Sequence, residues 1–156
     1  MARFLAAALV CLAALSACGN STDVNQVKSI VEKSNHEQED AFAAHDPGLM
    51  QDAFTARAFA YMVRTNDLLE QEGAVGIRLT QLEWVDVSVS SPTTAQATTF
   101  ETWEQTDQDG NTFSSRDRNQ YRLIKIGDSW KIDELNYPDK DLTPAPDQPG
   151  LPSGVP

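Results

Sequence analysis

The residue with the most distinctive chemistry in this sequence is Cys18, because a thiolate is both a nucleophile and a ligand for soft metals. The chain has two cysteines, and the other, Cys11, lies inside the apolar run Phe4–Ala14. That run follows a positive start at Arg3 and precedes small residues, an order that predicts a secretory signal and a cleavage site. Because Cys11 would leave with the signal, the mature chain would keep one cysteine and form no internal disulfide.

The four residues that end in this cysteine carry a resemblance of their own. Leu15-Ser16-Ala17-Cys18 is similar to the lipobox, the processing signal of bacterial lipoproteins. The resemblance implies cleavage before Cys18 and lipid on its sulfur and its new amino group. Two or more acyl chains hold a protein stably at a membrane. We therefore expect a lipid anchor on the extracytoplasmic face of the cell membrane, or of the outer membrane in a Gram-negative source, and no free thiol.

The two histidines stand in an acidic stretch that has the residue types of a metal site. His36 and Asp40 are four residues apart and would share one helix face, with Glu37, Glu39 and His45 nearby. A zinc site needs three or four converging ligands, and no second cluster accompanies this one in the sequence. We expect a solvated acidic helix face and no metal.

General acid–base chemistry would need a polar group inside the fold, and four residues are candidates. They are Asp86, Tyr121, Tyr61 and His36. Asp86 lies between two valines and faces away from them in a strand, so burial of the valines would expose it. We assign no catalytic residue, and no nucleophile motif or phosphate-binding loop is present in the sequence.

Four aromatic residues are candidates for lining a ligand pocket: Trp84, Phe100, Tyr121 and Trp130. Aromatic residues of a sheet also pack as plain core. The sequence leaves both interpretations open.

Apolar residues at helical spacing predict three helices in the first half of the chain. Asp23 is placed to cap the first helix. Asp46-Pro47 indicates the start of a short second helix. The third is expected from about Ala56 to Glu72, where Gly73 can end it.

Beyond Gly73 the period of the apolar residues changes to about two, which predicts strands. The expected strands span about Ile77–Val89, Thr94–Thr106, Thr112–Ile126 and Trp130–Tyr137. The alternation of the first strand slips at Leu79–Leu82 and at Trp84–Val85. Such slips predict bulges or bends.

Asp109-Gly110 and Gly127-Asp128 predict hairpin turns. Two-residue loops would pair Leu123 with Ile132, Lys125 with Trp130, Arg122 with Asp133, Glu101 with Arg118, and Trp103 with Arg116. This register places Phe100 on the core side with Tyr121, and Glu101 on the outer face.

The end of the chain differs in composition from the rest. Six of the eight prolines lie between 138 and 156, which predicts a disordered tail. The expected organisation is a signal peptide at 1–17, a lipidated cysteine and tether at 18–23, one folded domain at 24–137 and the tail at 138–156.

The chain is acidic, with a net charge of −11 that becomes −12 when Arg3 leaves with residues 1–17. No basic patch is present to displace counterions from phosphates, so we expect no nucleic acid partner. The same acidity opposes binding of the domain itself to anionic headgroups.

Three helices followed by four long antiparallel strands, one of them bent, is the element order of the NTF2-like cone fold. Closer resemblance comes from four segments: Trp84–Val89, Ala95–Glu101, Tyr121–Ile124 and Trp130–Ile132. They resemble the IMS-type domain of the NTF2-like superfamily, known from plastid division proteins and bacterial envelope proteins. The resemblance implies an α+β fold in which N-terminal helices pack on a curved antiparallel sheet of about four strands. It also implies a binding or scaffold domain with no cofactor and no family-wide catalytic residues.

These observations together predict a membrane-anchored, extracytoplasmic lipoprotein that is not an enzyme. Its domain would bind an envelope protein or a small apolar ligand. The alternative is a small enzyme, similar to SnoaL-like cyclases or ketosteroid isomerases, with its pocket inside the cone. That alternative needs a converging acid–base pair.

Overall fold

The computed structural model describes residues 21–139, which form helices followed by strands in the predicted order. The helical elements are α1 (Ser21–Ala44), the 3-10 helix η1 (Pro47–Ala53) and α2 (Ala56–Gln71). The strands are β1 (Ala74–Ser91), β2 (Thr94–Asp107), β3 (Thr112–Ile126) and β4 (Ser129–Asp139). None of the helices among these residues has the length and apolar character needed to cross a membrane.

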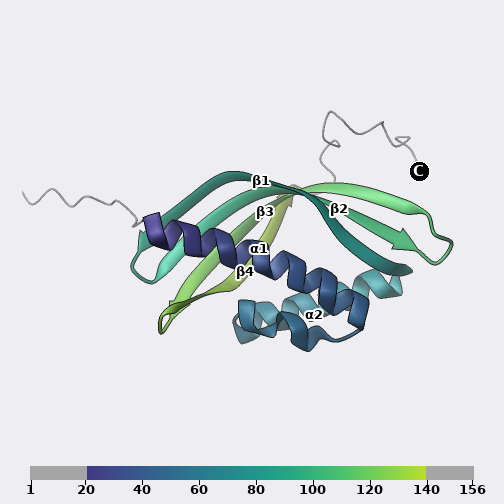
Figure 1. The fold of residues 1–156 in the computed structure, drawn as a ribbon, viewed down its shortest axis with the longest axis horizontal. Helices are drawn as coiled ribbons and strands as arrows, with labels where there is room; N and C mark the ends of the chain where they lie inside the picture. Colours follow the sequence, from purple (N-terminus) through teal and green to yellow (C-terminus); the bar gives the residue numbers. More distant parts are fainter. Residues whose placement is uncertain (1–20, 140–156) are drawn as a thin grey trace, which may run out of the picture.

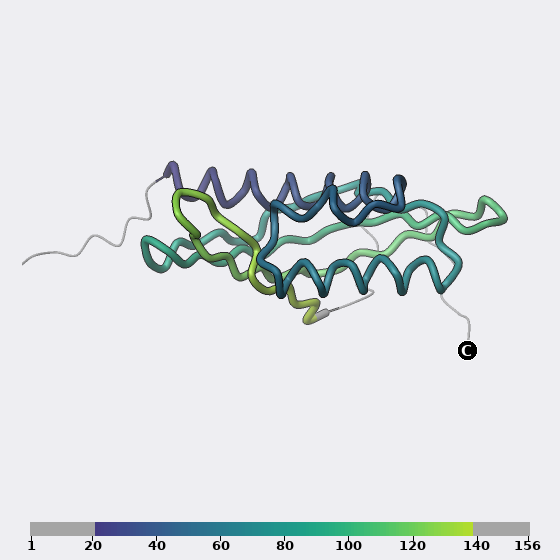
Figure 2. Tube along the Cα trace, turned by 90° about the horizontal axis from the view of Figure 1, so that it is seen from below, coloured from purple at the N-terminus to yellow at the C-terminus, as the bar shows by residue number. Residues whose placement is uncertain are grey.

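The strands form one antiparallel sheet in the order β1-β2-β3-β4. The sheet is strongly curved, and the helices lie on its concave side (Figure 1). Figure 2 shows α1 and α2 running along this side of the sheet, joined by η1. The predicted α+β architecture of helices on a curved four-stranded sheet is confirmed.

The starts and ends of the helices follow local sequence. The Asp46 carboxylate accepts a hydrogen bond from the Gly48 amide at 2.9 Å, at the start of η1. The Thr55 hydroxyl accepts one from the Ala58 amide at the start of α2. Gly73 follows α2 with a φ of 95°, a conformation that costs other residues energy.

The bend of β1 comes from bulges, as the sequence predicts. The pairing of β1 with β2 shifts between Leu79 and Gln81 and again between Trp84 and Asp86. The second shift leaves Val85 exposed and returns Val87 to the core side. Asp86 is exposed, as expected for a side chain on the opposite face from Val87.

The hydrophobic core fills one part of the concave side. Val27 and Val31 of α1, Met50 of η1, and Leu123 and Ile132 of the sheet are fully buried there. Trp130 joins this core, and its indole N–H donates to the Asp23 carboxylate at 3.3 Å. Asp23 lies inside α1 and bonds to β4 and β3 side chains, so the predicted capping role is replaced by a tertiary one.

The register between β3 and β4 is close to the prediction. Leu123 pairs with Ile132 and Lys125 with Trp130, as expected. A shift next to Arg122 places that residue opposite Glu134, and not opposite Asp133. The Arg122 guanidinium still donates to Asp133 at 2.5 Å and to Glu134 at 3.1 Å.

The predicted register between β2 and β3 is wrong by one residue. Glu101 pairs with Asp117, and not with Arg118; Trp103 pairs with Ser115, and not with Arg116. The reason is a longer hairpin loop. The Asp107 carboxylate accepts hydrogen bonds from the amides of Asp109 and Asn111, which adds a residue to the turn.

A slip of one residue moves every side chain of a strand to the other face. Phe100, expected on the core side, therefore lies on the outer face under the Arg116 guanidinium, 4.5 Å from its ring centre. Glu101, expected outside, is 1% exposed on the concave side.

Candidate functional site

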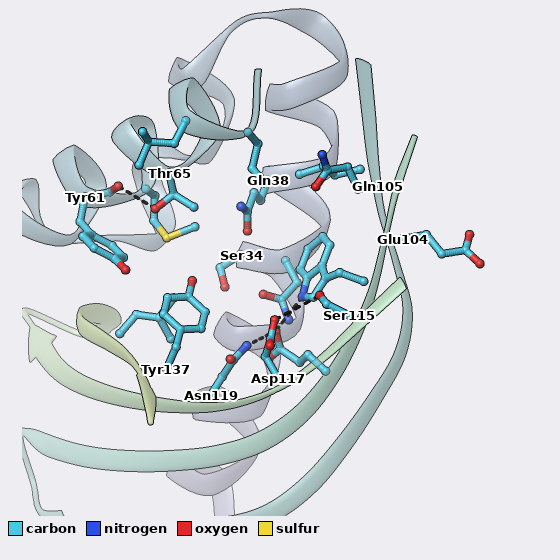
Figure 3. A pocket seen from close by; sticks show the side chains of 18 of the residues that line it. Ser34, Gln38, Tyr61, Thr65, Glu104, Gln105, Ser115, Asp117, Asn119 and Tyr137 are labelled. Carbon is cyan, nitrogen blue, oxygen red and sulfur yellow. Dashed lines mark hydrogen bonds between the residues drawn. The ribbon is translucent and has the colours of Figure 1, made fainter. Parts of the chain in front are cut away.

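A cavity of about 510 Å³ lies between the helices and the concave face of the sheet. The middle of α1, the second half of α2, and the parts of β2, β3 and β4 nearest the β2–β3 hairpin line it (Figure 3). Its apolar walls include Met62, Leu69, Ile77 and Leu135. Its aromatic residues are Phe54, Tyr61, Trp103, Phe113, Tyr121 and Tyr137.

Glu101 lies in the floor of this cavity and is held by four neutral donors. The Thr99 hydroxyl donates to Oε1 at 2.8 Å and the Tyr121 hydroxyl donates to the same oxygen at 2.6 Å. Oε2 accepts from Trp103 Nε1 at 3.2 Å and from Asn119 Nδ2 at 2.5 Å. Alternation along β2 and β3 brings these side chains to one face.

This arrangement limits what Glu101 can do. A carboxylate has about four positions at which it accepts hydrogen bonds, and the four donors occupy them. A general base needs a free position for the proton that it removes. The geometry thus favours a fixed negative charge in the cavity floor over a catalytic base.

Tyr121 connects Glu101 of β2 with Asn35 of α1. Tyr121 is 3% exposed, and its hydroxyl also lies 3.4 Å from Asn35 Oδ1 of α1. Burial, and then the negative charge of Glu101, raise the pKa of Tyr121 well above its ordinary value. Tyr121 therefore stays protonated and remains a donor to Glu101 at physiological pH.

Two amide side chains in the same floor have polar atoms with no partner. Asn35 and Asn119 are 4% and 2% exposed, and Asn35 Nδ2 and Asn119 Oδ1 accept or donate no hydrogen bond within the described residues. A buried polar atom without a partner costs about 1–3 kcal/mol. Both residues line the cavity, so water or a molecule bound there can supply these partners.

The charges around the cavity are mostly negative. Glu72, Glu101, Glu104 and Asp117 line it, and Arg64 is the cation among its lining residues. Glu104 is paired with Arg78 across the β1–β2 ladder. Burial, followed by the neighbouring Tyr61, Glu101 and Asp117, raises the pKa of Tyr137.

The four aromatic residues proposed from the sequence as pocket-lining lie in four different environments. Tyr121 lines the cavity. Trp130 is 2% exposed in the core. Trp84 lines a second, shallower pocket, with Lys28 Nζ 5.1 Å from its ring centre. Phe100 is on the outer face.

The other candidates are also dispersed. Tyr61 lines the cavity, whereas His36 is exposed and pairs with Glu39 at 3.1 Å. His45 pairs with Glu70 of α2 at 2.8 Å. No group of three or more potential metal ligands forms within residues 21–139. Cys18 lies outside the described residues.

Glu101, Asn119 and Asn35 are site residues that the sequence analysis missed. The signal for Glu101 was present in its own strand. Ala95, Ala97 and Glu101 share one alternation phase, and small apolar residues in that phase mark the buried face. An uncertain hairpin loop length outweighed that signal.

No protein-family model matches the sequence, and no curated protein matches it. Solved structures do match in fold. The intermembrane space region of the chloroplast protein ARC6 is 22% identical, with a TM-score of 0.61 over 74% of this chain and 95% of that one. A putative dehydratase of the NTF2-like family from Streptomyces avermitilis is 18% identical, with a TM-score of 0.54 over 72% and 93%. A type 2 hexachlorocyclohexane dehydrochlorinase is 10% identical, with a TM-score of 0.58 over 87% and 100%.

The chain thus has the NTF2-like α+β cone fold. Proteins with this fold include an intermembrane space region and proteins named as enzymes. The fold alone therefore does not decide the function, which must be argued from the cavity.

Proposed function

We propose that this protein is a lipid-anchored, extracytoplasmic binding protein that holds a small, largely apolar molecule in its cavity without catalysing a reaction on it. The observation that carries the proposal is the cavity of about 510 Å³, with unpartnered amide atoms of Asn35 and Asn119 in its floor. Ligand sites typically combine apolar walls with a few placed polar groups in a volume of this order.

Two features support small-molecule binding over a purely structural domain. The cavity remains between the helices and the sheet although Trp130 and Leu123 pack as core elsewhere on the concave side. Tyr61, Leu68 and Phe113 line the cavity and are still about half exposed, so apolar surface connects it with solvent. An envelope protein as partner is the other binding role expected from the sequence.

A small enzyme is the second candidate, because Glu101 and Tyr121 form a close carboxylate–hydroxyl pair in the cavity. Structural neighbours include a putative dehydratase and a dehydrochlorinase. The four hydrogen bonds to the Glu101 carboxylate oppose an enzymatic function, because they leave it no free position for a substrate proton. A catalytic reading requires one of these donors to leave before a substrate proton can be accepted.

The proposal is tested by filling the cavity. Thr65 of α2 lines it, and Ala60 of the same helix is exposed and does not. The probe is the neutral apolar dye N-phenyl-1-naphthylamine, titrated into the Cys18→Ser full-length chain so that no lipid or detergent competes. We expect saturable fluorescence enhancement that Thr65→Trp reduces at least about tenfold in affinity, because the indole would occupy the dye's volume.

Ala60→Trp is the matched control, since it adds the same side chain to the outer side of the same helix. It should leave dye affinity within about twofold. Equal dye binding by the two variants would overturn the cavity as the binding site.

A further inference from the structure

We infer that the ligand of this cavity is an alkylammonium, an apolar body that carries a protonated amine. The inference rests on the proposed function, because it names the class of molecule that the same cavity takes. It is carried by the buried carboxylate of Glu101 together with the unpartnered carbonyl oxygen of Asn119.

Glu101 is a buried carboxylate without a cationic partner. Its four donors are neutral, and no lysine, arginine or histidine of residues 21–139 forms an ion pair with it. A buried carboxylate usually has a cationic partner, because a charge removed from water is costly unless it is compensated. A cationic ligand in the adjoining cavity would supply the missing charge.

The unpartnered oxygen of Asn119 selects a donor. Asn119 Nδ2 is committed to Glu101 Oε2 at 2.5 Å, which orients the amide and leaves Oδ1 as an acceptor without a partner. An ammonium group has several N–H donors and no acceptor. It can therefore satisfy this oxygen while its charge faces the Glu101 carboxylate.

The aromatic walls suit the same head group. Tyr61 and Tyr137 lie with their ring centres 6.5 Å apart, and Trp103 and Phe113 also line the cavity. The faces of such rings attract cations by about 0.5–2 kcal/mol. In Figure 3, Tyr137 lies beside Asn119, and Tyr61 lies further toward α2.

The same lining disfavours an anionic ligand. A carboxylic acid or a phosphate would place its charge among Glu72, Glu101 and Asp117, with Arg64 as the cation of the lining. Like charges in a partly desolvated site repel strongly. Fatty acids, which have the same apolar body, are thus disfavoured by their head group alone.

The test compares head groups on one apolar body. Decylamine, decanol and decanoate are each titrated against the dye bound to the Cys18→Ser full-length chain, at pH 7 and below micelle-forming concentrations. The affinity of each compound is measured from the displacement of the dye. We expect decylamine to bind at least about tenfold more tightly than decanol, which corresponds to about 1.4 kcal/mol. Decanoate should bind more weakly than decanol.

A pair of variants assigns the preference to Glu101. Glu101→Gln removes the charge with little change in shape, and it should bring the decylamine-to-decanol ratio close to one. Glu32→Gln removes the same charge from an exposed position of α1 that does not line this cavity, and it should keep the ratio. Circular dichroism establishes that each variant is folded. If Glu101→Gln does not fold, the comparison of decylamine, decanol and decanoate in the protein with Glu101 intact tests the inference.

The outcomes separate the two proposals. Decanol binding as tightly as decylamine would overturn the alkylammonium ligand and leave the binding cavity standing. Failure of the dye and of all three probes to bind would overturn the proposed function itself. A decylamine preference that survives Glu101→Gln in a folded protein would also count against this inference.

Discussion

Glu101 shows how one buried carboxylate organises the floor of the cavity. Side chains of β2, β3 and, through Tyr121, α1 converge on it, although these residues are far apart in the chain. Hydrogen bonds to a charged group contribute about 1.5–3 kcal/mol each. The network thus contributes to stability as well as to the electrostatics of the site.

Tyr121→Phe tests this network. The substitution keeps the ring and removes the hydroxyl that donates to Glu101 at 2.6 Å. We expect the free energy of unfolding to fall by about 1.5–3 kcal/mol, measured by urea denaturation. Tyr61→Phe is the matched control, because it removes the same hydroxyl from a tyrosine that lines the same cavity and is 44% exposed. Its effect should stay within about 0.5 kcal/mol, and equal losses would contradict the assigned role.

The first turn of α1 is attached to the sheet by a side chain and not only by apolar packing. The Asp23 carboxylate accepts hydrogen bonds from Lys125 Nζ at 2.9 Å and from Trp130 Nε1 at 3.3 Å. These two hydrogen bonds lower the pKa of Asp23 below its ordinary value of 3.8. The contact joins the start of α1 to the hairpin between β3 and β4.

This contact predicts a pH dependence of known sign. A carboxyl whose pKa is lowered by folding stabilises the protein above pH 3.8, and this contribution is lost as the pH falls through the lowered pKa. Asp23→Asn should lower the melting temperature at pH 6. The difference in melting temperature from the unmutated protein should become small once the pH falls below the lowered pKa of Asp23. Asp67→Asn, at an exposed position of α2, should show no such convergence. A difference at Asp23 that does not change with pH would contradict the ionic role.

The curvature of the sheet has its origin in β1. Bulges, among them those after Leu79 and Trp84, let one long strand return apolar side chains such as Val87 to the concave face while it bends around the helices. The cavity lies on the same side, toward the β2–β3 hairpin. Bent strands and helices on one face together produce a cone that the core residues do not fill.

The whole molecule carries a net charge of −11, which opposes attachment of the domain to anionic headgroups. We therefore propose that Cys18 supplies the attachment to the membrane. Cys18→Ser should move the protein from the membrane fraction to the soluble extracytoplasmic fraction on cell fractionation. Cys11→Ser, within the expected signal, should leave it in the membrane fraction. Retention of the Cys18→Ser protein at the membrane would refute lipid anchoring as the means of attachment.

Much of the fold followed from local patterns. The bounds of α2 and β3, the bulges of β1 and the pairing of Leu123 with Ile132 were predictable, because helical period, strand alternation and turn residues act over a few positions. The face of Glu101 was not, since it depends on the length of the β2–β3 loop. One residue in that loop reverses inside and outside along the whole strand.

Local sequence therefore decided which segments are helices and strands, and it marked Cys18 and the tail by composition. Tertiary structure decided which polar residues meet. Glu101 and Asn119 become neighbours through the pairing of β2 with β3, and Asn35 joins them, through Tyr121, only when α1 crosses the curved sheet. The burial of these polar groups, and the lack of hydrogen-bond partners for some of them, depend on the folded structure around them. They cannot be predicted from the spacing of residues in the chain. The cavity, and the chemistry proposed for it, arise at that level.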